Sequence, residues 1–162
     1  MFRMKAFFTS VAGIFILVIS SSAQNLSEAQ LLELLDSHQF QFKAQNMYPS
    51  GGKMKVLMEN YTLTVKTDEV IADLPYAGRA YNAPMNPGDV GIKFDSKDYG
   101  WEMTERKKGG WEITITPKDG KDVRNCQLTV YENGNANLLV NSNNRQSINY
   151  SGVIAPLEKK AQ

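Results

Sequence analysis

The fold is decided by residues 126–140, which read CQLTVYENGNANLLV. Apolar and polar residues alternate on both sides of a central Glu-Asn-Gly, a pattern that predicts two strands joined by a tight turn. A two-residue Asn-Gly turn would set Val130 against Asn137, on the polar face. We predict a three-residue loop, Glu132 to Gly134, because the buried face fixes the register and glycine adopts the left-handed conformation that ends such loops. The resulting pairs are Cys126–Val140, Leu128–Leu138 and Val130–Ala136.

Residues 101–115 repeat this arrangement, with a loop of Lys107, Lys108 and Gly109. The predicted pairs are Trp101–Ile115 and Met103–Ile113. A last strand, residues 147–154, then pairs back so that Ile148 opposes Val140 and Tyr150 opposes Leu138.

Residues 54–65 also alternate, and they predict a hairpin with a two-residue turn at Glu59 and Asn60. This turn would place six apolar side chains on one face: Met54, Val56, Met58, Tyr61, Leu63 and Val65.

Residues 25–37 predict a short helix, followed from His38 by strand-like alternation. Ser27 is a good N-cap, and Gln30 completes a capping box. The apolar stripe consists of Leu31, Leu34 and Leu35. The helix either docks on the sheet or plugs a barrel end, or it binds a partner. We expect docking, because three leucines suit a short packed helix.

About eight to ten short strands with hairpin turns and one helix predict a mainly β domain. We expect an antiparallel barrel or a strongly curled sheet with one short N-terminal helix. A barrel would remove the exposed strand edges that an exported protein must otherwise protect. The alternative fold is a two-sheet β-sandwich.

Residues 1–23 predict a secretory signal peptide. Arg3 and Lys5 precede an uncharged apolar run, and small residues follow it up to Ala23. An uncleaved membrane anchor is the other interpretation, but the run is short for a bilayer span. We expect cleavage after Ala23, with no lipid anchor because no cysteine follows the run. The mature chain, residues 24–162, would then be a single domain in the periplasm or outside the cell, with no stable membrane anchor.

The charge balance excludes some partners. Two of the 18 basic residues lie in the signal peptide, which leaves 16 against 17 acidic residues. A near-neutral chain is not expected to bind nucleic acid, which selects basic faces. Cys126 and His38 are the only residues of their types and lie far apart in the sequence. We therefore expect no disulfide, metal, cofactor or enzymatic activity.

Residues 74–81, LPYAGRAY, fit neither a strand nor a simple turn. In a structural interpretation, Pro75 and Gly78 shape a tight crossing, and the tyrosines and arginine serve packing and hydrogen bonds. In a binding interpretation, the arginine holds an anionic or carbonyl group between two tyrosine rings at the mouth of a barrel cavity. The candidate ligand-binding residues are Tyr76, Arg79 and Tyr81.

This stretch, together with Tyr61 and residues 91–94, 133–136 and 148–152, resembles the domain-of-unknown-function family numbered 4251, small exported bacterial proteins. The family signature falls on Leu74, Pro75, Tyr76, Gly78, Arg79 and Tyr81. This chain departs from the family pattern at Ala77, where many members have an aromatic residue. The resemblance covers nearly the whole mature chain. It implies a lipocalin-like barrel and a periplasmic or secreted location, and it implies no activity.

We therefore expect a non-enzymatic binding module of the cell envelope that holds a small molecule or peptide in or at the mouth of a barrel. The binding-module hypothesis requires a pocket beside Arg79. The alternative is an envelope structural or protein-interaction protein, which would bind another envelope protein. It requires a contiguous exposed apolar patch.

Overall fold

The computed structural model describes residues 26–81, 91–119 and 122–158. The predicted signal peptide, residues 1–23, lies outside the described residues. The described elements are α1 (Glu28–Asp36), β1 (Phe40–Tyr48), β2 (Lys55–Lys66), β3 (Glu69–Leu74), β4 (Ile92–Ser96), β5 (Tyr99–Glu105), β6 (Trp111–Pro117), β7 (Val123–Val130), β8 (Asn135–Ser142) and β9 (Ile148–Pro156).

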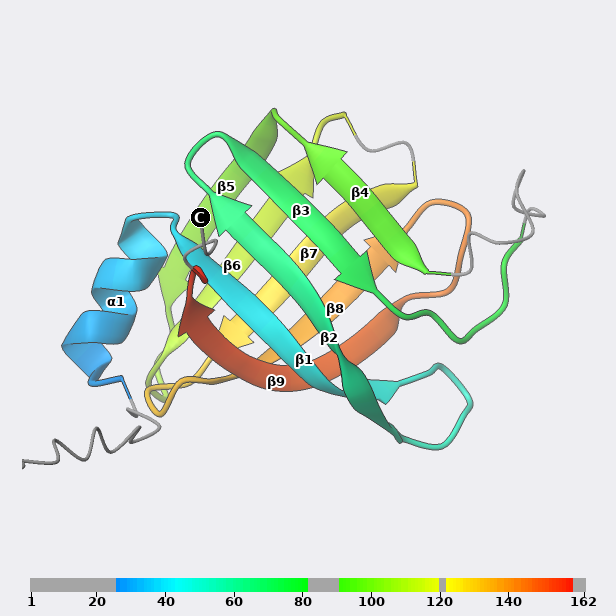
Figure 1. Cartoon of the computed structure of the whole chain (residues 1–162), viewed down its shortest axis with the longest axis horizontal. Coiled ribbons are helices and arrows are strands. Elements are labelled where there is room, and N and C mark those ends of the chain that lie inside the picture. Colours follow the sequence, from blue (N-terminus) through cyan, green and yellow to red (C-terminus); the bar gives the residue numbers. More distant parts are fainter. Residues whose placement is uncertain (1–25, 82–90, 120–121, 159–162) are drawn as a thin grey trace, which may run out of the picture.

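All nine of these strands belong to one antiparallel sheet, in the order β4-β3-β2-β1-β9-β8-β7-β6-β5. The sheet curls until its end strands, β4 and β5, meet at the short turn that joins them (Figure 1). Among the described residues, no ladder of hydrogen bonds joins β4 to β5. The barrel is therefore nearly closed, with a seam between these two strands. The prediction of a mainly β, barrel-like fold is confirmed, and the strands form one sheet rather than the two of a sandwich.

Both three-residue loops are confirmed by the register. Cys126, Leu128 and Val130 pair with Val140, Leu138 and Ala136. The β5–β6 pairs are also as predicted, as are the two β8–β9 pairs. Gly109 and Gly134 have φ angles of 83° and 80°, the left-handed conformation that these loops need.

The predicted turn at Glu59 and Asn60 is wrong, because β2 continues through these residues without reversing. The β1–β2 register shifts between Ala44 and Asn46, which leaves residues 57–60 without a paired residue in β1. We call residues 57–60 the β2 bulge. Period-two alternation continues on either side of such a bulge, so the local pattern could not distinguish it from a turn.

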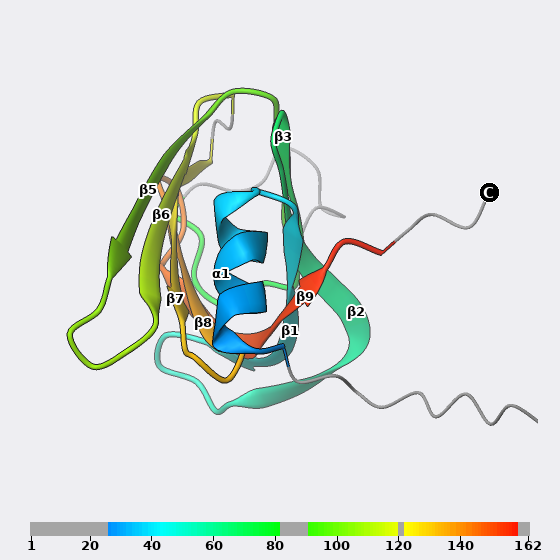
Figure 2. The ribbon, with the colours of Figure 1, turned by 90° about the vertical axis from the view of Figure 1, so that its left-hand side faces the viewer.

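The helix α1 closes one end of the barrel. The Ser27 side chain accepts from the Gln30 main chain, and the Gln30 side chain accepts from the Ser27 main chain, so the capping box is present. Leu31 and Leu35 are fully buried in the core. Figure 2 shows the helix lying between the two halves of the curled sheet. This burial confirms that the helix docks on the sheet.

His38 connects the end of α1 to β5. Its φ of 53° is left-handed, a conformation that ends helices but costs a non-glycine residue about 1–2 kcal/mol. The Tyr99 hydroxyl donates to the Lys66 carbonyl at 2.7 Å, so the Nδ1 atom of His38, 3.2 Å from that hydroxyl, acts as the donor. The centre of the imidazole ring also lies 4.2 Å from the centre of the Trp101 ring. These ring contacts offset the backbone strain.

The interior of the barrel is filled with side chains. One cluster of buried apolar residues extends from α1 through the sheet, and Tyr150, Phe40 and Phe42 are the largest of its fully buried side chains. Cys126 belongs to it, and burial raises the pKa of its thiol to about 12. The cysteine therefore remains a protonated core side chain.

Gly152 of β9 marks a close approach to β1. A Cβ atom at this position would lie 1.9 Å from the Lys43 carbonyl oxygen and 3.0 Å from the Phe42 ring. We expect Gly152→Ala to lower the free energy of unfolding by about 3 kcal/mol, because the strands must separate. Gly100→Ala is the matched control, since its Cβ would meet Thr116 at an ordinary 3.5 Å. Equal urea midpoints for the two variants would contradict the prediction.

The burial of His38 leads us to expect a lower free energy of unfolding in mild acid. Burial lowers the pKa of its imidazole below 6.5, despite the opposing charge of Asp36. The unfolded chain then binds the proton more readily than the folded chain, so the free energy of unfolding is highest above this pH and falls as the pH drops through it. His38→Gln should remove most of the slope between about pH 7.5 and 5.5 in urea denaturation, because the chain has no other histidine. An unchanged slope in the variant would rule this cause out.

Candidate functional site

Residues 75–81, here called the strap, cross the end of the barrel that lies away from α1 (Figure 1). Pro75 follows the last residue of β3 and has no N–H to donate to a continued ladder. The strap then pairs with residues 144–146. Ala80 bridges Arg145, the Tyr81 N–H donates to the Asn144 carbonyl at 2.8 Å, and the Gln146 N–H donates to the Arg79 carbonyl at 3.2 Å.

Two tyrosines hold the strap. The Tyr150 hydroxyl, in the core, donates to the Pro75 carbonyl at 2.6 Å. The Tyr76 hydroxyl lies 3.0 Å from the Arg79 carbonyl and 3.1 Å from the Gln146 carbonyl. Burial raises the pKa of both tyrosines, so both remain protonated donors at neutral pH. A Cβ atom on Gly78 would lie 2.6 Å from the Tyr76 hydroxyl, which explains the glycine.

Arg145 joins four segments at this end of the barrel. Its Nε atom lies 2.9 Å from a carboxylate oxygen of Asp122, and its guanidinium donates to the Gly91 carbonyl at 2.8 Å. The guanidinium also lies 5.3 Å from the centre of the Tyr76 ring, within cation–π range. Only 18% of the side chain is exposed. Sequence reasoning missed this residue because its partners come from distant segments that only the fold brings together.

The three predicted ligand-binding residues differ from one another in how far their side chains are exposed to solvent. Tyr76 is half-buried, whereas Arg79 and Tyr81 are exposed, Tyr81 by 68%. Among the described residues, the Arg79 guanidinium has no hydrogen bond or ion pair. The arginine in cation–π contact with the Tyr76 ring is Arg145. A role in ligand binding stays a prediction for all three residues.

A pocket of about 320 Å³, here called the mouth pocket, opens where β3 meets the strap. Its lining residues are Glu59, Tyr61, Asp73, Leu74, Pro75, Tyr76, Gly91 and Lys93. Lys93 and Asp73 form an ion pair at 3.4 Å, and the Tyr61 hydroxyl donates to Glu59 at 2.8 Å. The mouth pocket therefore lies beside Tyr76 and not beside Arg79.

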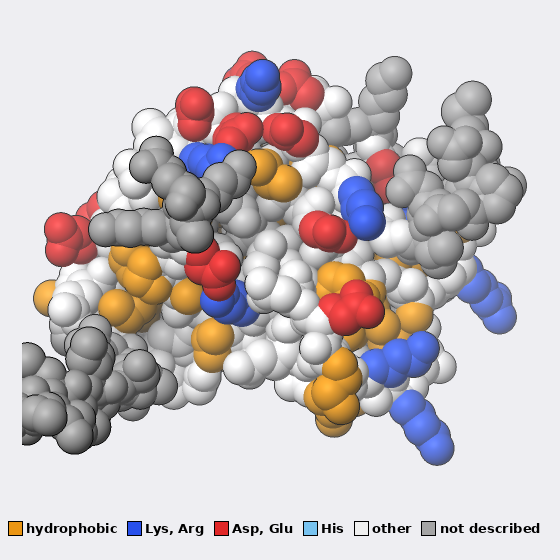
Figure 3. Space-filling model, viewed as in Figure 1, with side chains coloured by type: hydrophobic (Ala, Val, Ile, Leu, Met, Phe, Trp, Pro, Cys, Tyr) orange, Lys and Arg blue, Asp and Glu red, His pale blue; other side chains and the backbone are white. Residues whose placement is uncertain are grey.

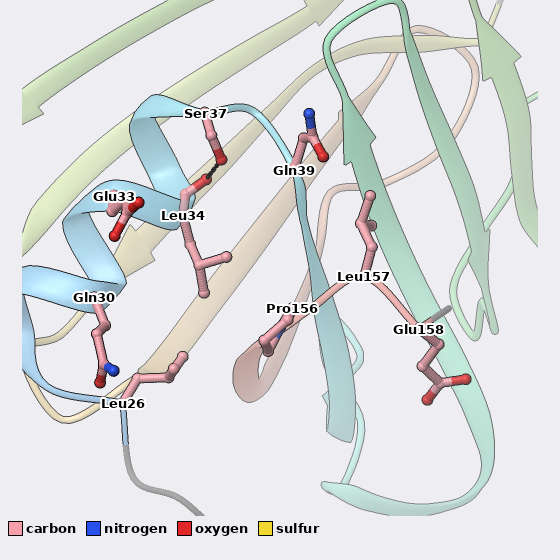
Figure 4. A pocket seen from close by; sticks show the side chains of 9 residues that line it. All are labelled: Leu26, Gln30, Glu33, Leu34, Ser37, Gln39, Pro156, Leu157 and Glu158. Atoms are coloured by element: carbon pink, nitrogen blue, oxygen red, sulfur yellow. Dashed lines mark hydrogen bonds between the residues drawn. The ribbon is translucent and has the colours of Figure 1, made fainter. Parts of the chain in front are cut away.

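A larger open groove, about 590 Å³, lies between α1 and the end of β9. We call it the helix groove. Figure 4 shows Leu26 and Leu34 on the helix side, across from Pro156 and Leu157. Its lining residues are Leu26, Gln30, Glu33, Leu34, Ser37, Gln39, Pro156, Leu157 and Glu158. Leu34 was predicted for the apolar stripe, but the facing wall comes from the far end of the chain and gave no local signal.

The described part of the chain brings together no cluster of His, Cys, Asp and Glu side chains that could hold a metal ion. Among the described residues, no helix is both long and apolar enough to cross a bilayer.

The Tyr150 hydroxyl offers a direct test of how the strap is held. Tyr150→Phe leaves the Pro75 carbonyl without its donor, so we expect a loss of about 1–2 kcal/mol in the free energy of unfolding. We also expect faster hydrogen exchange at the Tyr81 amide. Tyr131→Phe is the control, because that hydroxyl lies at the surface and accepts only from Asn137 among the described residues. Unchanged exchange at Tyr81 would show that Tyr150 does not secure the strap.

The comparisons with known proteins agree with the resemblance noted in the sequence. The family model described as Domain of unknown function (DUF4251) matches residues 22–154. The chain is also similar to the crystal structure, at 1.95 Å resolution, of a DUF4251 family protein from Bacteroides eggerthii DSM 20697. The two share 19% identity with a TM-score of 0.60, and the match covers 83% of this chain and 90% of that chain. This likeness shows the fold, and no curated protein matches the chain. Because the family model spans most of the sequence, the protein belongs to the DUF4251 family.

Proposed function

We propose that the protein is a non-enzymatic binding module of the cell envelope, which holds a small amphiphilic molecule or peptide segment in the helix groove. The observation that carries this proposal is the groove itself, an apolar surface with a polar rim at one end of the barrel. Its volume of about 590 Å³ is in the range that small-molecule sites have. The predicted signal peptide supports an envelope location.

The packed interior favours a site on the outside of the barrel. The buried cluster occupies the space between the two halves of the sheet, and α1 fills one end with Leu31 and Leu35. A ligand inside would have to displace these side chains, each at a cost of about 2–5 kcal/mol. The helix groove takes a ligand without any such displacement.

The lining of the groove indicates the class of ligand. Leu26, Leu34 and Leu157 offer apolar contact, while the rim carries the carboxylates of Glu33 and Glu158. Glu158 pairs with Lys43, whose hydrogen bond and positive charge lower the pKa of that carboxylate. Glu33 has no ion pair among the described residues, so its carboxylate is available to bind a cationic group of a ligand. We therefore expect a ligand with an apolar body and a cationic group.

Titration of the purified, isotopically labelled protein with octylamine and with octanoate tests this proposal. Octylamine should shift the amide resonances of Leu34 and Leu157, and octanoate should shift them less. Glu33→Gln should weaken octylamine binding by about two- to fivefold, as expected for one exposed ion pair. Glu28→Gln is the matched control, because Glu28 is exposed on the same helix but does not line the groove.

Two results would contradict the proposal. Absence of shifts at the groove with either probe would remove the groove as a binding site. Equal effects of Glu33→Gln and Glu28→Gln would remove the assigned role of the Glu33 charge.

A further inference from the structure

The β2 bulge leaves part of a strand without neighbours. On one side, β1 supplies no paired residue for residues 57–60. On the other side, the β2–β3 ladder begins only at Thr62, opposite Asp73. Neither the β1–β2 ladder nor the β2–β3 ladder therefore pairs a residue with the β2 bulge. Such an unpaired edge is a ready template for pairing with another chain.

The same place carries a contiguous set of exposed apolar side chains. Met58 is 92% exposed and Val56 is 60% exposed, and the exposed Tyr48 and Met54 lie near the same end of the β1–β2 ribbon. Figure 3 shows hydrophobic side chains gathered over the start of β2, with positive side chains close by. A bulge that only blunted the edge would not need to present methionine and valine to solvent. This patch meets the requirement that we set for a protein-interaction surface.

The sequence of this segment is complementary to itself. Residues 55–59 read Lys-Val-Leu-Met-Glu. When two copies are aligned antiparallel about Leu57, Lys55 of each copy faces Glu59 of the other. Val56 faces Met58 in the same way, and Leu57 faces its own copy. Opposite charges and apolar side chains directly across an antiparallel pair are both stabilising.

We propose that residues 55–59 form an interface through which two copies of this chain join, edge to edge, about a twofold axis. The charges needed for it are accessible. Among the described residues Lys55 has no ion pair, and Glu59 accepts from Tyr61 through one oxygen at 2.8 Å, which leaves its other oxygen for a lysine. The interface shares no residue with the lining of the helix groove, so the two proposals stand independently.

Charge reversal at the two ends of the segment tests this interface. By symmetry, Lys55→Glu places two glutamates opposite two glutamates, and Glu59→Lys places two lysines opposite two lysines. Each single variant should raise the dimer dissociation constant about tenfold. The double variant K55E/E59K restores both pairs and should dimerise like the unmodified protein. An equimolar mixture of the two single variants should form heterodimers, because every pair is then again complementary.

Sedimentation velocity of the full protein, from about 1 µM to about 1 mM, measures the association expected of a small interface. Lys107→Glu is the control, since Lys107 is exposed in the β5–β6 loop far along the chain from this segment, and it should leave association unchanged. Thermal unfolding of each variant shows whether it is folded. Met58→Asp is a second disruptive variant that does not depend on the charge pairs.

Restored dimerisation in the double variant and in the mixture would establish the antiparallel register. A protein that is monomeric throughout this range would overturn the proposal. So would a dimer that is unaffected by Lys55→Glu, Glu59→Lys and Met58→Asp, or a double variant that stays as weak as the single ones.

Discussion

The rest of the structure depends on the ladder between β1 and β9. Strands β1 to β4 form one meander and β5 to β9 another, and among the described strands only this ladder passes from the first to the second. A row of small residues crosses it, because Gly152 lies opposite Ala44 of β1 and Ala136 of β8. The missing Cβ lets the strands approach closely, and the neighbouring register shift in β1 adds twist. Together they allow one sheet to bend enough to form a barrel.

A sheet that curls without closing leaves two ends to cover, and the protein covers them by different physical means. The helix α1 uses apolar burial of Leu31 and Leu35, which is not directional. The strap uses hydrogen bonds from Tyr76 and Tyr150 and the ion pair of Arg145, because irregular backbone at that end needs polar partners. The α1 end should therefore accept other apolar residues of similar volume, whereas the strap depends on particular donors and acceptors.

The sequence was sufficient where one local requirement decided the structure. The registers around Gly109 and Gly134 followed from keeping apolar side chains on one face, and the capping of α1 followed from Ser27 and Gln30. It was insufficient where distant segments decided. The turn predicted at Glu59 fails because β1 lies along β2, which alternation within β2 does not reveal. The role of Arg145 needs Tyr76, Gly91 and Asp122 at one place, and nothing in its neighbouring residues indicates that.

The signature stretch divides into residues that the fold uses and residues that it leaves in solvent. Leu74 is buried, the Pro75 carbonyl receives a core hydroxyl, and the missing side chain of Gly78 makes room for Tyr76. Arg79 and Tyr81 have exposed side chains, yet their main chains are fixed by pairing with residues 144–146. Stability alone therefore does not explain why these two positions carry a guanidinium and a phenol. A ligand that binds the side chains of Arg79 and Tyr81 would find their backbone already ordered. Binding would therefore cost less conformational entropy than binding to a backbone that is not ordered in advance.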